Sequence, residues 1–149
     1  MYGRVASKLA RKEIDLVNDN IKIALFTNSY VPNYHAHEFY SAIANELVGS
    51  GYVAGGKSLA SKVLTQKTSD SRWVYSAADQ TWTALTGNFR YAVIYDDSVT
   101  SKPLIACIDF GGAQSASGGQ DVTVRFEYEY LNTETGTYDT ERGLLVIAY

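Results

Sequence analysis

Residues 88–112, NFRYAVIYDDSVTSKPLIACIDFGG, are the stretch of the chain that decides the expected fold. Within it lie two apolar runs of strand length, residues 89–95 and 103–110, both rich in β-branched and aromatic side chains. The polar segment that joins them begins with Asp-Asp-Ser at residues 96–98, and these residue types favour turns. The pattern therefore predicts a β-hairpin. Because neither run alternates cleanly between apolar and polar residues, we expect both faces of this pair to be covered by other parts of the chain.

The size of the chain fits one domain. At 149 residues, with 46% hydrophobic and 19% charged residues, it is long enough to bury a hydrophobic core without disulfides or metals. We therefore predict a single domain that spans residues 1–149. Its twelve tyrosines, two tryptophans and five phenylalanines favour a β-rich structure, because aromatic rings pack well on pleated sheets and at interfaces.

The expected cellular setting follows from the cysteine and apolar content. Cys107 is the only cysteine and lies in an apolar run, so we expect a buried thiol, no intramolecular disulfide and a reducing compartment. No apolar stretch is long enough to span a membrane, and charged residues occupy the N-terminus where a secretory signal needs its apolar core. We expect a soluble protein, made in a cytoplasm, that has no membrane partner.

The charge of the chain is unevenly distributed. The formal net charge of −3 is too small to imply a nucleic-acid partner. The first twelve residues, however, contain Arg4, Lys8, Arg11 and Lys12 and no acidic residue, so this +4 segment is attached to a body of charge −7. A basic end on an acidic body favours contact with another acidic surface, such as a neighbouring copy. The alternative interpretation is a solvated helix face.

Outside the central hairpin the sequence predicts short strands, turns and little helix. Residues 5–14 have helical spacing of apolar side chains, and residues 37–47 are interpreted as a second short helix. Four glycines within residues 49–56 require positive φ or the close approach of another backbone segment. Further strands are predicted at residues 21–27, 57–66, 72–77, 81–85, 122–131 and 144–149. Residues 111–121 are expected to be a small-residue loop that is flexible or orders only against a partner, and residues 132–140 a polar hairpin loop.

These elements predict a mainly β fold. Many short strands with turn signals, and no alternation of strands with helices, favour an antiparallel β-sandwich of about nine strands with a short N-terminal helix. Residues 1–14 are expected to form a helical arm whose removal, through residue 13, leaves the sandwich folded. Residues 121–149 are expected to form a C-terminal hairpin extension.

The sequence gives little indication of chemistry. A metal site at His35 and His37 needs a further ligand, for which Glu38 is the near candidate, and no HxxxH pattern or cysteine partner exists. Asp96 and Asp97 could offer carboxylates to calcium, but the EF-hand pattern is absent and acidic pairs at hairpin tips usually form turns. No GxSxG nucleophile motif is present. We therefore expect no enzyme activity, no catalytic residue, no cofactor and no metal.

The tyrosines allow two interpretations. They could form a platform on which a sugar ring stacks, although packing in the core or at a subunit interface is the commoner use of such rings. The candidates for a platform are Tyr30 and Tyr34, or Tyr128, Tyr130 and Tyr138.

Three segments resemble a family of small virion structural proteins of tailed bacteriophages. They are IDLVNDNIKIALFTNSYVPN, HEFYSAIANELVGSGYVAGGKSLASK and WTALTGNFRYAVIYDDSVTSKPLIACIDFGG, in the family's order and covering roughly residues 14–112. Members often show a "D.IKVAL.TSSYTP" start, a "NEVSGTGYTAGG..L..K" middle and a "W......RYAVIY.......PLI..IDFG" hairpin. The resemblance implies a phage particle component built around a β-sandwich. The part after Gln120 is longer than the family's usual single terminal strand, and the basic N-terminal helix is particular to some members.

We therefore expect a non-enzymatic virion protein, assembled in the bacterial cytoplasm and located in the phage particle. The leading hypothesis is a capsid decoration or cement protein that binds the major capsid protein and forms a homo-oligomer, without nucleic acid. One alternative is a tail, neck or tail-fibre component, and another is a host-surface carbohydrate-binding module. The candidate partner-binding residues are Arg4, Lys8, Arg11, Lys12, Gln114, Tyr128, Tyr130 and Tyr138.

Overall fold

The computed structural model describes residues 1–67, 72–132, 137–143 and 145–148, and within them the chain is mainly β with one short α-helix. Every strand pairing in this part of the chain is antiparallel. The elements in order are α1 (Val5–Ala10), β1 (Ile21–Phe26), the 3₁₀ turn η1 (Tyr40–Ala42), β2 (Lys57–Ser58), β3 (Val63–Lys67), β4 (Arg72–Ser76), β5 (Gln80–Asp96), β6 (Leu104–Val124), β7 (Glu127–Asn132), β8 (Thr137–Arg142) and β9 (Leu145–Ala148).

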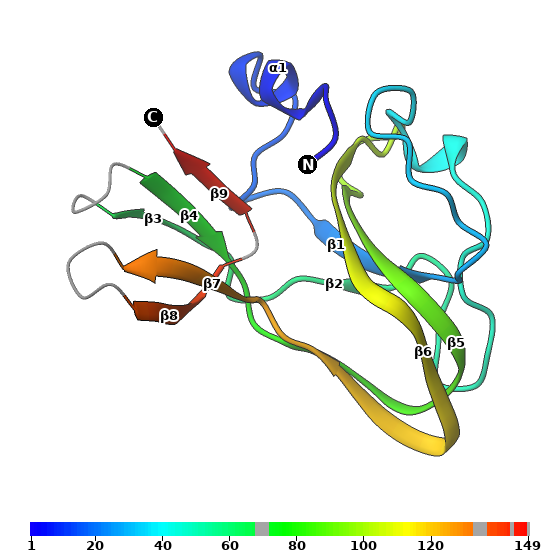
Figure 1. Cartoon of the computed structure of the whole chain (residues 1–149). Coiled ribbons are helices and arrows are strands. Elements are labelled where there is room, and N and C mark those ends of the chain that lie inside the picture. The colour runs from blue at the N-terminus through cyan, green and yellow to red at the C-terminus, as the bar shows by residue number, and fades with distance from the viewer. Residues whose placement is uncertain (68–71, 133–136, 144, 149) are drawn as a thin grey trace.

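The strands form one larger sheet and two smaller ones. The larger sheet has the order β2-β1-β5-β6, the second has the order β3-β4-β9, and β7 pairs with β8 alone. Figure 1 shows β5 and β6 as a long hairpin that turns sharply partway along its length, while the smaller sheets lie at the opposite side of the molecule. The prediction of a mainly β fold with antiparallel strands and a short N-terminal helix is confirmed.

The predicted central hairpin is confirmed and is longer than expected. The strands predicted at residues 81–85 and 89–95 are one continuous strand, β5. The predicted loop at residues 111–121 is wrong, because these residues belong to β6. The many small residues in this segment favoured a loop, but glycine also occurs in strands where the pairing is irregular.

The core is centred where β1 pairs with the second half of β5. Residues 21–26 pair in register with residues 96–91, and both faces of this region are covered. Its apolar side chains are at most 7% exposed: Ile21, Ile23, Ala24, Leu25, Phe26, Tyr91, Ala92, Val93, Ile94 and Tyr95. The absence of apolar–polar alternation in these runs is therefore explained by burial on both sides.

The glycine-rich segment 49–56 runs directly against two strands. A Cβ atom at Gly49 would lie 1.8 Å from the carbonyl oxygen of Thr86 in β5, and one at Gly56 would lie 1.9 Å from the carbonyl oxygen of Ile23 in β1. Gly56 also has a φ of +68°. The predicted need for close backbone approach and positive φ is confirmed.

The helix predicted at residues 37–47 is wrong. Only the single turn η1 forms there. The backbone beyond it bonds to β1 instead, because Leu47 N–H donates to the carbonyl oxygen of Leu25 and Thr27 N–H donates to that of Asn45, at 2.8 and 2.9 Å. Hydrogen bonds to a neighbouring strand thus replace those that a helix would need.

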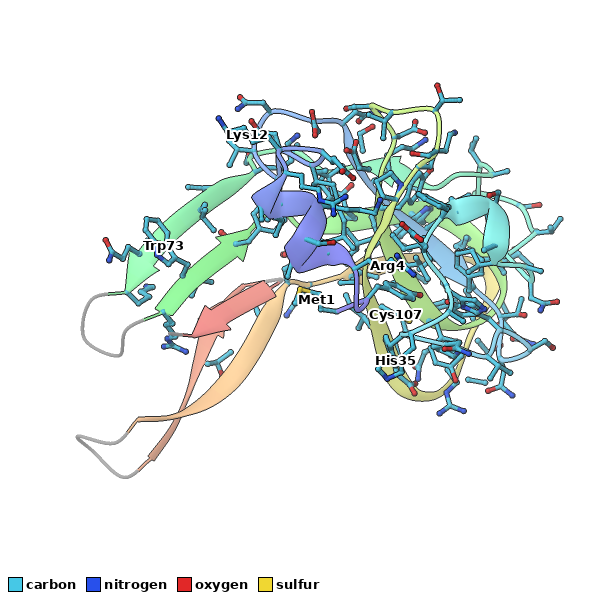
Figure 2. The ribbon with its side chains drawn as sticks, turned by 90° about the horizontal axis from the view of Figure 1, so that it is seen from above. Met1, Arg4, Lys12, His35, Trp73 and Cys107 are labelled. Carbon is cyan, nitrogen blue, oxygen red and sulfur yellow. The ribbon has the colours of Figure 1, made fainter. Side chains whose placement is uncertain are left out.

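The N-terminal helix α1 is shorter than predicted and is part of the folded body. Tyr2 and Val5 are 2% and 0% exposed, and Tyr2 N–H donates to the carbonyl oxygen of Ile105 in β6 at 3.0 Å. Seen from above, the helix lies between the three-stranded sheet and the long hairpin, with Met1 and Arg4 at its start and Lys12 beyond its end (Figure 2). Removal of residues 1–13 would therefore expose core surface, which argues against the prediction that the sheets stay folded without them.

The C-terminal region differs from the predicted simple hairpin. The strand predicted at residues 122–131 is interrupted, since β6 ends at Val124 and β7 begins at Glu127. Between them, Phe126 is 2% exposed and its carbonyl oxygen accepts a hydrogen bond from Gly143 N–H. The loop predicted at residues 132–140 is partly wrong, since β8 begins at Thr137. The predicted terminal strand is confirmed as β9, which pairs with β4 in the three-stranded sheet.

Candidate functional site

The basic N-terminal segment binds the chain's own acidic residues. Lys8 Nζ lies 3.2 Å from a carboxylate oxygen of Glu38 and 3.4 Å from one of Glu13, and it lies 4.8 Å from the centre of the Phe39 ring. Its side chain is only 12% exposed. Lys8 is thus oriented toward the chain's own surface, where it helps to hold α1 in place.

The other predicted cations are more accessible. Arg4 pairs with Glu38 at 3.3 Å and Arg11 with Glu13 at 3.8 Å, yet their side chains are 67% and 75% exposed. Lys12 is exposed and follows the helix in a left-handed conformation with φ of +59°. Ion pairs this exposed contribute little to stability. Arg4, Arg11 and Lys12 therefore present positive charge at one end of the molecule.

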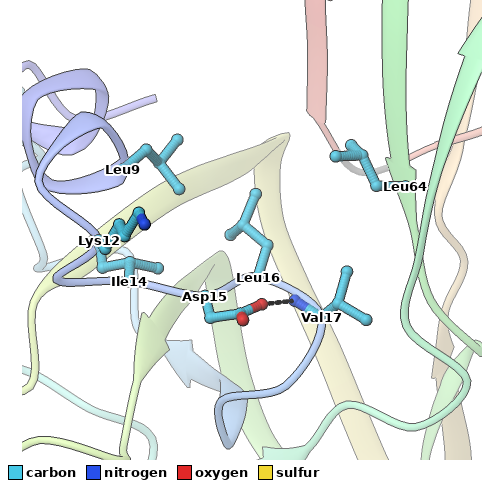
Figure 3. Close-up of a pocket in the computed structure, with 7 residues that line it drawn as sticks. All are labelled: Leu9, Lys12, Ile14, Asp15, Leu16, Val17 and Leu64. Carbon is cyan, nitrogen blue, oxygen red and sulfur yellow. Dashed lines mark hydrogen bonds between the residues drawn. The ribbon is translucent and has the colours of Figure 1, made fainter.

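Lys12 also borders an apolar hollow between α1 and β3. Figure 3 shows Leu9 and Ile14 on one side of this hollow and Leu64, which extends from β3, on the other. Val17 and Leu64 are each 39% exposed. The carboxylate of Asp15 accepts a hydrogen bond from Val17 N–H at 3.0 Å and so shapes the intervening turn. No local sequence pattern indicates this hollow, because its two sides are distant in the chain.

Gln114 lies in β6 where that strand has more residues than its partner. Phe89 pairs with Gln114 and Tyr91 with Asp109, so one intervening residue of β5 faces four intervening residues of β6, 110–113. The extra residues form a bulge that protrudes, because a Cβ atom at Gly111 would have no atom within 4 Å. Gln114 borders a second hollow beside Phe89 and Phe110. The segment predicted as a partner-contacting loop is therefore a bulged strand edge.

The predicted tyrosine platforms have different outcomes. Tyr30 is 3% exposed, and its hydroxyl lies 2.5 Å from that of Tyr2 and 3.3 Å from His37 Nδ1, so it packs in the interior and is not part of a sugar platform. Burial raises its pKa to about 12. Tyr34 is 39% exposed.

The C-terminal tyrosines are on the paired strands β7 and β8. Tyr130 pairs with Asp139 and Tyr138 with Leu131 along the backbone. The side chains of Tyr128, Tyr130 and Tyr138 lie outside the described part of the structure.

His37 and Cys107 make contacts within the fold. His37 stacks on Tyr30 with ring centres 5.9 Å apart. Its Nδ1 atom lies 3.3 Å from the backbone N–H of Asn33. Cys107 is half-buried rather than fully buried, and desolvation raises the pKa of its thiol to about 11. A thiol with a raised pKa is mostly protonated at neutral pH, so it is a poor nucleophile.

The acidic hairpin tip contains two aspartates in different environments. Asp97 pairs with Lys102 at 2.7 Å and with Lys22 at 3.6 Å. Asp96 is fully buried, at 0% exposed, and lies close to the carboxyl group of Asp19. Among the described residues, no group of three or more His, Cys, Asp or Glu side chains converges in the manner of a metal centre. The approach of Asp19 to Asp96 could not be predicted from the sequence, since no local motif connects the two segments.

In comparisons with protein-family models, with curated proteins and with solved structures, no match to the chain was found. Within the described ranges, none of the helices is both long enough and apolar enough to cross a bilayer. What the chain does is therefore inferred from its residues and their arrangement.

Proposed function

We propose that this chain is a non-enzymatic structural protein of a tailed-bacteriophage virion, and most specifically a capsid decoration or cement protein. In this proposal its sheets form a rigid β-sandwich scaffold of about nine strands that binds neighbouring subunits of the shell. It carries no active site and acts through protein–protein contacts.

The observation that carries the proposal is where the family-like residues lie. The three segments that resemble the phage family include β1, the glycine-rich crossing at residues 49–56 and the β5–β6 hairpin, and these segments pack against one another as one unit. Glycine is required at positions 49 and 56, because a Cβ atom at either would collide with a backbone carbonyl oxygen of a neighbouring strand. The resemblance therefore involves positions that determine the fold, which supports a shared scaffold.

The exposed features supply candidate contacts for a partner. They are the cations Arg4, Arg11 and Lys12 at the N-terminal end and the β6 bulge beside Gln114. Lys8 is given a supporting role, because its ammonium group is already bound to Glu13 and Glu38. A scaffold that binds only the assembled shell stabilises it in the way any ligand stabilises the state that it binds.

The first test is the copy number of this chain in purified particles of the phage that encodes it. Quantitative mass spectrometry against the major capsid protein should give hundreds of copies, as positions on an icosahedral shell require. A count near a small ring number, roughly six or twelve, would replace the decoration hypothesis with a tail or neck component. Absence from the particle would overturn the proposal.

A second test concerns the mechanism. Particles that lack the chain should lose their genome at a lower temperature, and adding back the purified protein should restore the original value. Arg11→Glu should weaken this rescue if the exposed cations contact an acidic shell surface. Lys102→Glu is the control, because it makes the same change of charge at a different place, the tip of the β5–β6 hairpin.

The carbohydrate-binding alternative has a direct test of its own. Wild-type protein on a glycan array should give no signal under our proposal. Reproducible binding that disappears in Tyr128→Ala, Tyr130→Ala protein would favour the carbohydrate-binding module instead.

A further inference from the structure

The turn before β1 and the tip of the β5–β6 hairpin meet at a single junction. Asn20 N–H donates to the hydroxyl oxygen of Ser98 at 2.6 Å, and Asp97 N–H donates to the carbonyl oxygen of Asn20 at 2.9 Å. These hydrogen bonds join segments that are far apart in the sequence. They also bring Asp19 next to Asp96.

Asp96 has one carboxylate oxygen that no described donor reaches. Its Oδ1 atom accepts a hydrogen bond from Ser98 N–H at 2.7 Å. Its Oδ2 atom is buried and has no hydrogen-bond donor among the described residues. The nearby carboxyl group of Asp19 raises the pKa of Asp96, and its own Oδ2 atom accepts a hydrogen bond from Asp15 N–H at 2.6 Å. Two ionised carboxylates offer only acceptors to each other. A buried polar oxygen without a partner is costly, so this arrangement favours a cation or a proton beside the two carboxyl groups.

The lysines near the junction do not supply that group. Lys62 Nζ donates to the main-chain carbonyl oxygen of Asp19 rather than to a carboxylate. Lys22 and Lys102 both pair with Asp97. Among the described residues, neither Asp19 nor Asp96 has an ion pair with a lysine or an arginine. When both carboxyl groups are ionised, they carry a charge of −2 that a divalent cation would neutralise.

We propose that Asp19 and Asp96 bind one hard divalent cation, with the properties of Ca²⁺, at this junction. An all-oxygen environment suits calcium, which accepts carboxylate, carbonyl, hydroxyl and water oxygens in irregular geometry. Asp19 is partly exposed, which gives the cation a route from solvent, whereas Asp96 forms the buried side of the site. With only two carboxylates, the site binds weakly, on the order of the millimolar affinities of extracellular calcium modules. The bound cation joins the segment that leads from α1 to the end of β5.

The alternative occupant is a proton shared by the two carboxyl groups. Burial and the nearby Asp19 carboxylate both raise the pKa of Asp96, while the hydrogen bond from Ser98 N–H opposes this shift. A group whose pKa is raised on folding makes the protein more stable as pH falls through the folded pKa. The other charged groups that surround the junction are Asp15, Lys22, Lys62, Asp97 and Lys102. A bound cation therefore makes stability increase with calcium, whereas a shared proton makes stability increase with acid and leaves it independent of calcium.

The test is thermal unfolding of the full chain at neutral pH, in chelator and in millimolar calcium chloride. With calcium at about ten times its dissociation constant, we expect the melting temperature to rise by roughly 3 to 5 °C. Asp96→Asn should abolish this response. It should also melt higher than wild type in chelator, because its amide can donate to Asp19. Asp97→Asn is the matched control and should retain the calcium response, since Asp97 is paired with lysines.

Three results would overturn the cation site. One is a wild-type melting temperature that calcium does not change, with stability in chelator that increases on mild acidification, as a shared proton requires. Another is an equal calcium response in wild type and Asp96→Asn. The third is an equal response to sodium chloride of matched ionic strength, which would show that general screening of charge is the cause. These results concern the isolated chain, so they leave the proposed role in the virion untouched.

Discussion

The two halves of the β5–β6 hairpin are built from one pair of strands but pair in different ways. Near the connecting turn, β5 pairs on one edge with β6 and on the other with β1, and its residues 91–94 face β6 in continuous register. Farther from the turn, β5 pairs with β6 alone, and the register shifts three times between Trp82 and Tyr91. A third strand and burial on both faces fix the register of the near half. Within the described ranges, no third strand pairs with the far half, so it accommodates bulges.

The largest expected effect comes from the near half. Ile94 is 0% exposed, and Ile94→Ala should lower the free energy of unfolding by about 2 to 5 kcal/mol through lost burial and a residual cavity. Val122 lies in the far half and is only half-buried, so Val122→Ala should lower the free energy of unfolding by clearly less. Denaturant unfolding of the two purified variants compares them directly. Equal losses would show that the far half contributes as much to stability as the near half.

An intermediate effect is expected at the bulges themselves. Gly118 has a φ of +68° and open space where a side chain would lie, so Gly118→Ala should cost about 1 kcal/mol of stability from backbone strain alone. Gly112 has equally open space without a positive φ. Gly112→Ala should therefore leave the denaturant midpoint nearly unchanged. A neutral Gly118→Ala variant would mean that the bulge relaxes to another conformation.

The smallest expected effect lies at the boundary between the two halves. Arg90 donates two hydrogen bonds to the carboxylate of Asp109, at 2.9 and 3.0 Å, and Gly111 N–H donates a third at the start of the bulge. These contacts, with Arg90 the main cause, hold the pKa of Asp109 below its ordinary value of 3.8. The stability that they contribute is present above pH 3.8 and is lost as pH falls through the lowered pKa.

Comparison of wild type with Asp109→Asn measures this contribution. The difference in their melting temperatures should be small at neutral pH and should disappear in acid, because Asp109 is then protonated. High salt should reduce it as well, since the pair is exposed. A difference that grows on acidification would contradict the assignment of the pKa shift to Arg90.

The sequence predicted the elements whose pattern is local. The run IKIALF became β1, the apolar runs at residues 89–95 and 103–110 became the paired parts of β5 and β6, and the glycines at 49–56 proved to be close backbone contacts. The predictions failed where backbone partners lie elsewhere in the chain. Residues 37–47 have helical spacing, but Asn45 and Leu47 hydrogen bond to the β1 region instead.

The candidate sites were harder to predict than the strands. A cluster of basic residues near the N-terminus suggested a free basic surface, but Lys8 is bound by Glu38, whose place beside α1 depends on the loop after β1. Asp96 was interpreted as a turn former, because the sequence around it does not indicate that Asp19 lies alongside. The predicted phage-particle role and its partners stay predictions, which the particle experiments above test.

The sequence by itself determined that this chain forms antiparallel β-structure with a central hairpin, a short N-terminal helix and glycines at tight crossings. These properties follow from side-chain periodicity and backbone preference, which each residue has before the chain folds. Only the tertiary structure decided that the Gly111–Gly119 region is a bulged strand edge, that Lys8 is occupied and that Asp19 meets Asp96. These outcomes depend on distances between segments remote in sequence, and such distances are set by the packing of the whole core.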